Sequence, residues 1–339
     1  MSRTAAPAPA GASARPEASI RTGTSARPAP AARPGASARD AAERSAGTPP
    51  FNPVVLMSSP EHFRTTDALN PYYSEAALDR DAAVEEHREI RQTLERVGVE
   101  VVSVDPPEES QDGVYTANWA LLHGGTAVMA RLPHARRAEE EHARQLLEGL
   151  GFATLEAPAG TRFSGQGDAL VCGRYALCGQ GYRSDAEAQA FACEALGLER
   201  VQLRTVPQLD DAGAPVVNGV TGWEDSFYYD IDLALAVVAE PSEGSPGLIA
   251  YCPEAFDAPS REALRSLEGV DLIEVDEREA REHFACNLVS TGHDVVMSAS
   301  APRLRAALEE RGLRTHTPRI SELAKGGGYI RCTTLTLRR

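Results

Sequence analysis

One pattern recurs five times between residue 51 and the C-terminus: an amphipathic helix that ends in a glycine-containing turn and leads into a short strand. Within each copy Leu, Ile, Val or Ala recurs at spacings of three and four, which is typical of a helix with one buried face. A glycine stands at each predicted helix end, where a left-handed residue closes the last turn. Repetition at roughly 50 residues indicates radially repeated units and not two unrelated domains. The copies span residues 87–104, 142–156, 190–206, 261–275 and 303–316, with Gly98, Gly151, Gly197, Gly269 and Gly312 at the turns.

A second piece accompanies each copy and consists of two short apolar strands joined by a tight turn. Four of these pieces are complete, at residues 117–130, 167–179, 230–240 and 286–298. The fifth copy offers only CTTLTL at residues 332–337, and VVLMSS at residues 54–59 is the segment that would complete it. Chain ends that finish one unit together close a ring. We therefore predict an α/β fold, a five-bladed α/β propeller with pseudo-five-fold repeats and helices outside. An open α/β sheet explains the alternation of elements, but not five copies in the same order.

Polar or nucleophilic residues stand at the head of these apolar strands, where a propeller gathers side chains around its axis. Taken singly, Asp and Asn before a strand often serve a turn through side-chain to backbone hydrogen bonds. Their recurrence in register in five units instead indicates a shared site. The residues are Asn118, Asp168, Asp230 with Asp232, Asn287 and Cys332.

Cys332 has the most informative neighbourhood, Lys-Gly-Gly-Gly-Tyr-Ile-Arg-Cys over residues 325–332. The glycines permit positive φ values and close approach of the backbone to a ligand, and Arg331 adds positive potential, so the thiol is a candidate activated nucleophile. The other five cysteines lie inside apolar segments and are predicted to be small core residues. Four histidines are candidate bases, and their spacing does not choose among them. A lone histidine is more often a surface or core residue than a catalyst. The four histidines are His62, His123, His283 and His293.

Residues 1–50 consist mainly of Ala, Pro, Arg, Ser, Gly and Thr, with one Ile and no aromatic residue. So little apolar surface does not offset the entropy lost on ordering, and we predict a disordered extension. Residues 51–339 then form a single catalytic domain. An organelle transit peptide is the alternative for the extension, but its frequent prolines disfavour the amphipathic helix that such a peptide needs.

Charge and composition narrow the class of protein. The net charge of −15 argues against a nucleic-acid-binding body, particularly since residues 1–50 carry seven Arg against three acids and leave the remainder more acidic still. No apolar run approaches about 18 residues and no signal core opens the chain, so we expect a cytoplasmic protein without a membrane partner. The six cysteines form neither a CxxC pair nor a cluster at zinc spacing, so neither a metal nor a disulfide framework is expected.

Seven segments together resemble the guanidine-modifying pentein enzymes, nearest to the dimethylarginine dimethylaminohydrolase-like and arginine dihydrolase-like members. The resemblance covers most of residues 51–339 and implies the five-bladed fold already inferred from the repeats. Its carriers are HFRTTDALNP (62–71), DGVYTAN (112–118), FSGQGDAL (163–170), GYRSD (181–185), YYDIDLALA (228–236), FACN (284–287) and KGGGYIRCTTLTL (325–337).

The resemblance implies a covalent mechanism. In that family a C-terminal cysteine, here Cys332, attacks the guanidinium carbon and forms a thiouronium intermediate that water or an amine resolves. Capture by a thiolate suits this carbon, which is a poor electrophile for water. Asp112, Asn118 and Asp232 match polar positions that hold the planar cation. The arginine dihydrolase-like members also have Asn at the position of Asn118. The family needs no cofactor, and no motif in this sequence calls for one.

Three positions depart from the family pattern. The histidine that protonates the leaving amine aligns with Asp230, or with Tyr229 in an alternative alignment. The family glutamate aligns with Ser164, and an aspartate after the His-Phe pair is replaced by Arg64. A carboxylate at 230 accepts a proton at pH 7 but donates one only if burial raises its pKa, and it disfavours a nearby thiolate. Arg64 implies a ligand with an anionic group if it faces the pocket; the alternative is a surface arginine.

We therefore predict a cysteine-dependent enzyme that hydrolyses a C–N bond in the guanidino group of an arginine-related small molecule. Amidino transfer, double hydrolysis to ornithine, a different reaction at the same cysteine and a non-catalytic binding protein are the alternatives. The expected catalytic residues are Cys332 and Asp230, and no metal is expected. The oligomeric state is left open, a homodimer included. The expected substrate-binding residues are Asp112, Asn118, Asp168, Asp232, Arg64 and Asn287.

Overall fold

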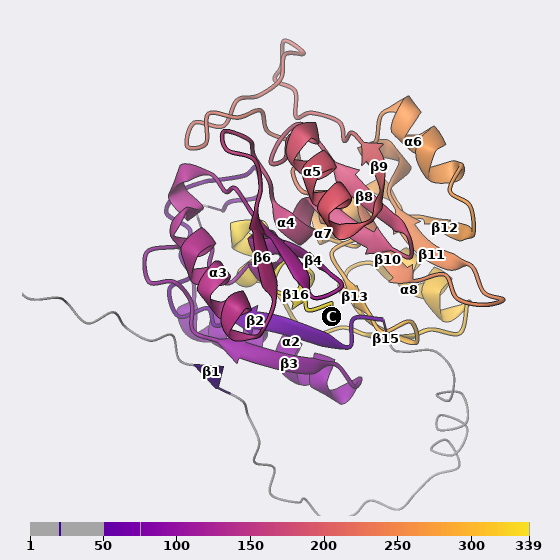
Figure 1. Ribbon diagram of the computed structural model, residues 1–339, viewed down its shortest axis with the longest axis horizontal. Helices are drawn as coiled ribbons and strands as arrows, with labels where there is room; N and C mark the ends of the chain where they lie inside the picture. The colour runs from indigo at the N-terminus through magenta and orange to yellow at the C-terminus, as the bar shows by residue number, and fades with distance from the viewer. Residues whose placement is uncertain (1–19, 22–50, 75, 339) are drawn as a thin grey trace, which may run out of the picture.

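The computed structural model describes residues 20–21, 51–74 and 76–338 (Figure 1). The described residues form five sheets that share one plan, in which an antiparallel strand pair is followed by a parallel pair. Four sheets are consecutive in the chain: β4 (Ala120–His123), β5 (Thr126–Met129) and β6 (Ala153–Glu156); β7 (Ala169–Cys172), β8 (Tyr175–Gly179) and β9 (Glu199–Leu203); β10 (Leu235–Ala239), β11 (Gly247–Tyr251) and β12 (Val270–Glu274); and β13 (Val289–Ser290), β14 (Asp294–Val296) and β15 (Arg314–His316).

The fifth sheet joins the two ends of the domain, as the sequence predicts. Strand β16 (Leu335–Thr336) pairs antiparallel with β2 (Val54–Ser58), with Leu335 opposite Leu56. Strand β2 in turn pairs parallel with β3 (Glu100–Val104). Figure 1 shows the yellow C-terminal strand beside the indigo β2. The last residues of the domain thus complete the unit that the first residues begin.

One helix precedes the last strand of every sheet, which confirms the five predicted helix–turn–strand copies. Gly197 has φ 67 at the C-cap of its helix, a left-handed conformation that favours glycine, and the other four predicted turn glycines also have positive φ. Figure 1 places α3, α5, α6 and α8 at the periphery and β4, β10, β13 and β16 nearer the middle. The five helices are α2 (Arg80–Arg96), α3 (Ala138–Gly149), α5 (Ala186–Leu196), α6 (Ala258–Arg265) and α8 (Pro302–Glu309).

Neighbouring units pack through these helices. Ala188 and Ala192 of α5 lie in one apolar cluster with Leu121 of β4 and Val128 of β5, so α5 covers strands of the preceding sheet as well as its own. The burial of small residues on α5 allows this close packing. Each unit therefore completes its core against its neighbour. The shorter helices are η1 (Thr116–Trp119), η2 (His134–Arg136), α4 (Gly165–Asp168), η3 (Ile231–Leu233), η4 (Pro253–Ala255), α7 (Glu277–His283) and η5 (Leu323–Gly326).

The predicted hairpin at residues 230–240 is wrong. Residues 231–233 form the turn η3, and β10 pairs with β11 at Gly247–Tyr251, beyond a longer connection. The carboxyls of Asp230 and Asp232 do not continue the apolar strand; they lie in the turn that precedes it. Asn118 and Asp168 lie in comparable turns, η1 and α4, immediately before β4 and β7.

The predicted disordered extension lies outside the described residues, except for β1 (Ile20–Arg21), which pairs antiparallel with β3. No helix in the described part of the chain is long and apolar enough to span a membrane.

Candidate active site

Side chains from four of the sheet units meet around a small cavity, and Asn287 of the fifth contacts the cysteine sulfur beneath it. The residues predicted at the strand heads thus converge. The free space is about 10 Å³, which is about the room that one water molecule needs. The described residues that line the cavity include no histidine. They are Asn70, Asp112, Tyr115, Asn118, Leu132, Pro133, Arg136, Ser164, Arg183, Tyr229, Asp230, Gly326 and Cys332.

Cys332 lines the cavity with its side chain 3% exposed. Nδ2 of Asn287 lies 3.2 Å from the sulfur, and the thiol lies 3.5 Å from Oδ2 of Asp232. The backbone N–H of Cys332 donates to Oδ1 of Asn287 at 3.1 Å. Asn287 therefore holds both the backbone and the sulfur of the candidate nucleophile.

The environment does not activate the thiol, contrary to the prediction from its neighbours in sequence. Burial and the carboxyls of Asp232 and Asp230 raise the pKa of Cys332 well above its usual value. The Arg331 guanidinium donates instead to Oε1 of Gln166 at 2.8 Å and to the carbonyl of Thr334 at 3.0 Å. In the free protein at neutral pH, Cys332 is therefore a thiol and not a thiolate.

The glycine run before Cys332 makes room for the protein's own side chains. A Cβ on Gly326 would collide with the Tyr115 hydroxyl, one on Gly328 with the Tyr115 ring, and one on Gly327 with Asn70. Gly327 also has φ 85, which disfavours other residues. The glycines, which were expected to let the backbone approach a ligand, are thus needed mainly for packing, although Gly326 does line the cavity.

Asp230 presents one free oxygen in the cavity lining. Its Oδ2 accepts from Nδ2 of Asn118 at 2.7 Å, whereas its buried Oδ1 has no hydrogen-bond partner. Burial raises the pKa of Asp230, and the nearby Arg183 opposes this rise. The Tyr229 hydroxyl donates to the carbonyl of Gly327 at 2.9 Å, so Asp230 is the better proton carrier of the two residues that align with the family histidine.

Asp168, Asp232 and Asn287 lie outside the cavity lining. Oδ1 of Asp168 accepts the backbone N–H of Ile231 at 3.0 Å and thereby anchors the turn η3 that carries Asp232. Burial and the nearby Asp230 raise the pKa of both Asp168 and Asp232 well above the usual value. The geometry gives these residues supporting contacts, and their contact with substrate stays a prediction.

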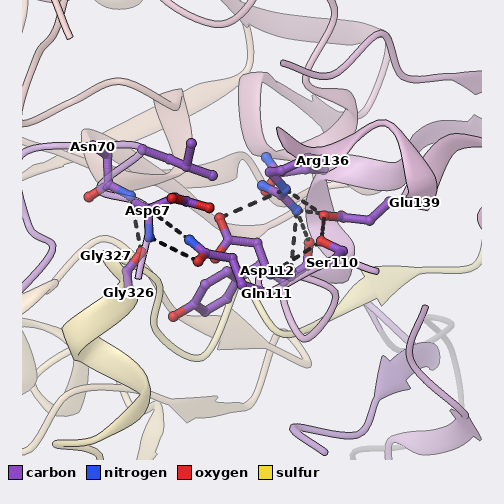
Figure 2. Close-up of polar contacts among 12 residues, drawn as sticks. Asp67, Asn70, Ser110, Gln111, Asp112, Arg136, Glu139, Gly326 and Gly327 are labelled. Carbon is purple, nitrogen blue, oxygen red and sulfur yellow. Dashed lines mark hydrogen bonds and ion pairs between the residues drawn. The ribbon is translucent and has the colours of Figure 1, made fainter. Parts of the chain in front are cut away.

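Asp112 and Arg64 were both predicted to bind substrate, and the structure places them differently. Asp112 lines the cavity, accepts the Tyr73 hydroxyl and lies 3.9 Å from Nε of Arg136 (Figure 2). Burial raises the pKa of Asp112 to about 6 against the opposing effect of Arg136. Arg64 is half-buried and is absent from the cavity lining.

Sequence reasoning missed two buried arginines of the lining, Arg136 and Arg183. Arg183 donates to the carbonyl of Leu69 and lies over the Tyr229 ring, 5.0 Å from its centroid. No carboxylate in the described residues lies within 4.0 Å of Arg183, whereas Arg136 is paired with Glu139. Arg183 falls in the GYRSD segment that carried the resemblance, so a signal existed for it; Arg136 falls in no such segment.

Comparison with known proteins identifies the family. Residues 59–339 match the family model described as N,N dimethylarginine dimethylhydrolase, eukaryotic. The chain belongs to this family. Within it, the chain is 33% identical over 285 residues to the N(G),N(G)-dimethylarginine dimethylaminohydrolase of Mycobacterium tuberculosis, covering 83% of this chain and 84% of that protein. The predicted resemblance is thereby confirmed.

A longer protein with a further domain is also similar to this chain. The bifunctional arginine dihydrolase/ornithine cyclodeaminase ArgZ of Synechocystis is 29% identical over 287 residues, which are 83% of this chain but 37% of ArgZ. The N-terminal domain of ArgZ, solved with bound substrate, superimposes with a TM-score of 0.71 and 27% identity over 84% of this chain and 98% of that domain. The Pseudomonas aeruginosa family enzyme with citrulline gives a TM-score of 0.62 at 19% identity over 83% of this chain and 98% of its own, which shows the shared fold.

Proposed function

We propose that this family member is an amidinohydrolase that cleaves a C–N bond in the guanidino group of an arginine-related small molecule. The observation that carries the proposal is the Cys332 sulfur in a cavity that also holds Asp112, Asn118 and Asp230. A planar cation with several N–H donors suits the carboxyls of Asp112 and Asp230 in this set. The names of the relatives, a dimethylarginine dimethylaminohydrolase and an arginine dihydrolase, support the same class of reaction.

The substrate itself supplies the charge that ionises the thiol. Besides burial, Asp232 and Asp230 raise the pKa of Cys332, because carboxylates near the sulfur oppose a further negative charge. A guanidinium bound among these groups offsets their field and favours the thiolate. The nucleophile therefore forms mainly when substrate is present, which protects the free thiol from other electrophiles.

Asp230 carries the proton through both halves of the reaction. Oδ1 of Asp230 accepts the thiol proton, and the thiolate sulfur forms a bond to the guanidinium carbon. Asp230 then donates this proton to the leaving nitrogen as the C–N bond breaks, which leaves a thiouronium on Cys332. Asp230 next accepts a proton from water, and the hydroxide adds to the same carbon. The C–S bond then breaks as the carbon-bound hydroxyl loses its proton to solvent, which releases a ureido product, and Asp230 returns its proton to the thiolate.

Arg183 is the residue we assign to an anionic group of the substrate, in place of Arg64. Its guanidinium is buried at the cavity and has no carboxylate within 4.0 Å among the described residues. Such a cation pairs strongly with the α-carboxylate of an amino acid. Arg64 retains the same hypothetical role only if it turns towards the cavity when ligand binds.

Replacement of Arg183 by methionine is expected to raise KM for arginine-like substrates roughly 10- to 100-fold, since it removes a charge-assisted hydrogen bond. Loss of Arg183 also raises the pKa of Asp230, so the kcat should change much less only at a pH well above that pKa. The measurement is steady-state kinetics with paired substrates that have or lack the α-carboxylate, and only the first of each pair should lose affinity. A larger loss in Arg64→Met than in Arg183→Met would transfer the role to Arg64.

The proposed function itself is tested by turnover. The purified full chain is incubated with arginine, methylated arginines, hydroxyarginine and citrulline, and products are identified by mass. We expect a ureido product and the released amine. Formation of ornithine from arginine, with release of carbon dioxide and two molecules of ammonia, would indicate double hydrolysis, which the asparagine at position 118 and the similarity to ArgZ favour as the second candidate. An amidino product formed with added amines would indicate transfer. Binding without any product would identify a non-catalytic binding protein.

We further propose that the five sheets close into the five-bladed propeller and that the protein is cytoplasmic. The shared sheet plan and the pairing of β16 with β2 support closure. A homodimer is the assembly to test first, by light scattering after size-exclusion chromatography.

A further inference from the structure

The orientation of the Asn118 amide is fixed by its surroundings. Nδ2 of Asn118 donates to Oδ2 of Asp230 at 2.7 Å and to Oγ of Ser164 at 2.8 Å, while Nη1 of Arg136 donates to Oδ1 of Asn118 at 2.8 Å. A guanidinium has donors only, so the amide oxygen must face Arg136 and the amide nitrogen must face Asp230. If the amide were flipped by 180°, its nitrogen would face the Arg136 guanidinium and its oxygen would face a carboxylate oxygen of Asp230, and neither pair could form a hydrogen bond.

Arg136 is itself locked in one position. Its Nε donates to Oε1 of Glu139 at 2.8 Å and its Nη2 donates to Oε2 at 2.6 Å, a bidentate pair that Figure 2 shows beside Asp112. Nη2 also donates to the carbonyl of Tyr115 at 3.2 Å. Glu139 is held in turn by the Ser110 hydroxyl at 2.5 Å and by Nε1 of Trp119 at 2.9 Å. The guanidinium thus has few donors left for a ligand.

We propose that Arg136 is a positioning residue. It holds the Asn118 amide in the one orientation that donates to Asp230, and it thereby leaves Oδ1 of Asp230 free for the transferred proton. This inference deepens the proposed function and rests on the role given there to Asp230. Because the amide donates to the ionised carboxylate, the contact from Arg136 through Asn118 to Asp230 favours the base form of Asp230.

Other charges act on Asp230 as well, so the test must separate this contact from them. Arg183 and Arg136 favour its ionised form through space, while the neighbouring acids oppose it. Replacement of Arg136 by lysine keeps the positive charge but loses the planar fork, so one ammonium cannot bind Glu139 and orient Asn118 with the same geometry. The titratable and charged groups around Asp230 are Arg136, Asp168, Arg183, Tyr229, Asp232 and Cys332.

The experiment is a double-mutant cycle of Arg136→Lys, Asn118→Ala and the double variant in the full chain. The first readout is the pH dependence of kcat. We expect Arg136→Lys to move the acidic limb of this profile upward by about one pH unit with KM within about twofold, because Asp230 loses a donor to its ionised form. Asn118→Ala should move it in the same direction. In the Asn118→Ala background, Arg136→Lys should add almost nothing.

The second readout needs no turnover. It is the rate at which iodoacetamide alkylates Cys332, mapped by peptide mass against pH. A neutral Asp230 no longer opposes the thiolate, so the plot of the logarithm of the rate against pH should bend where Asp230 titrates, and this bend should move to higher pH in both single variants. If the wild type converts no guanidino compound but this bend still moves as expected, the proposed function fails and the positioning role stands.

Arg338→Lys is the matched control, because Arg338 forms an ion pair with Glu240 at 2.6 Å outside the cavity lining. It should leave both profiles in place. If Arg136→Lys does not fold, Glu139→Gln keeps Arg136 but weakens its anchor, and it should give a smaller shift in the same direction. If Arg136→Lys still shifts the pH profile by the full amount in the Asn118→Ala background, the proposal is overturned. A higher KM with an unchanged pH profile would overturn it too, since Arg136 would then bind substrate directly.

Discussion

Cys332→Ser should lose at least about 10³-fold in kcat, because a serine hydroxyl in this site has no means of becoming an alkoxide at neutral pH. The substitution changes one atom and keeps the backbone contact to Asn287, so binding of substrate should persist. Steady-state turnover and ligand titration measure the two effects separately. Acid quenching of the wild type during turnover should trap an adduct on Cys332 that the variant lacks.

Cys193→Ala is the control for this substitution. Cys193 is also buried, but it lies on α5 beside Cys178 and outside the cavity lining. Its turnover should match the wild type once the folded fraction is taken into account. Undiminished kcat in Cys332→Ser would show that the sulfur takes no part in the reaction.

Asp230→Asn should produce two effects of opposite sign. The kcat should fall by about 10²- to 10⁴-fold, because the asparagine accepts the Asn118 amide but has no acidic proton to give to the leaving nitrogen. The pKa of the Cys332 thiol should fall at the same time, since one of the two carboxyls that raise it has become neutral. Cys332 should therefore react faster with a neutral alkylating agent at pH 7–8 while turnover is slower.

Asp225→Asn provides the matched comparison. Asp225 is buried, its pKa is raised by burial, and it accepts from Asn218 outside the cavity lining. It should change neither turnover nor alkylation of Cys332. If Asp230→Asn retains wild-type kcat, another group must move the proton, and the first to examine is Asp112, whose pKa of about 6 also suits proton transfer.

Much of the fold follows from short-range pattern. Helical spacing, the terminal glycines and the β-branched strands were sufficient to predict all five helix–turn–strand copies, because each depends on residues within one or two turns of one another. The pairing of β16 with β2 followed from counting strands in each unit. The third hairpin was misplaced because the apolar run over residues 233–239 is as long as two short strands, and periodicity does not separate these cases.

For the site, the sequence by itself indicated only part of the set of side chains that meet: of the residues predicted at the strand heads, Asn118, Asp230 and Cys332 share one cavity, whereas Asp168, Asp232 and Asn287 lie outside its lining. Only the tertiary structure decided whether these groups are protonated. Desolvation and the carboxyls of Asp230 and Asp232 raise the pKa of Cys332, although Arg331 is its neighbour in sequence. The field at a buried group depends on burial and on distances between remote segments, which local sequence does not encode.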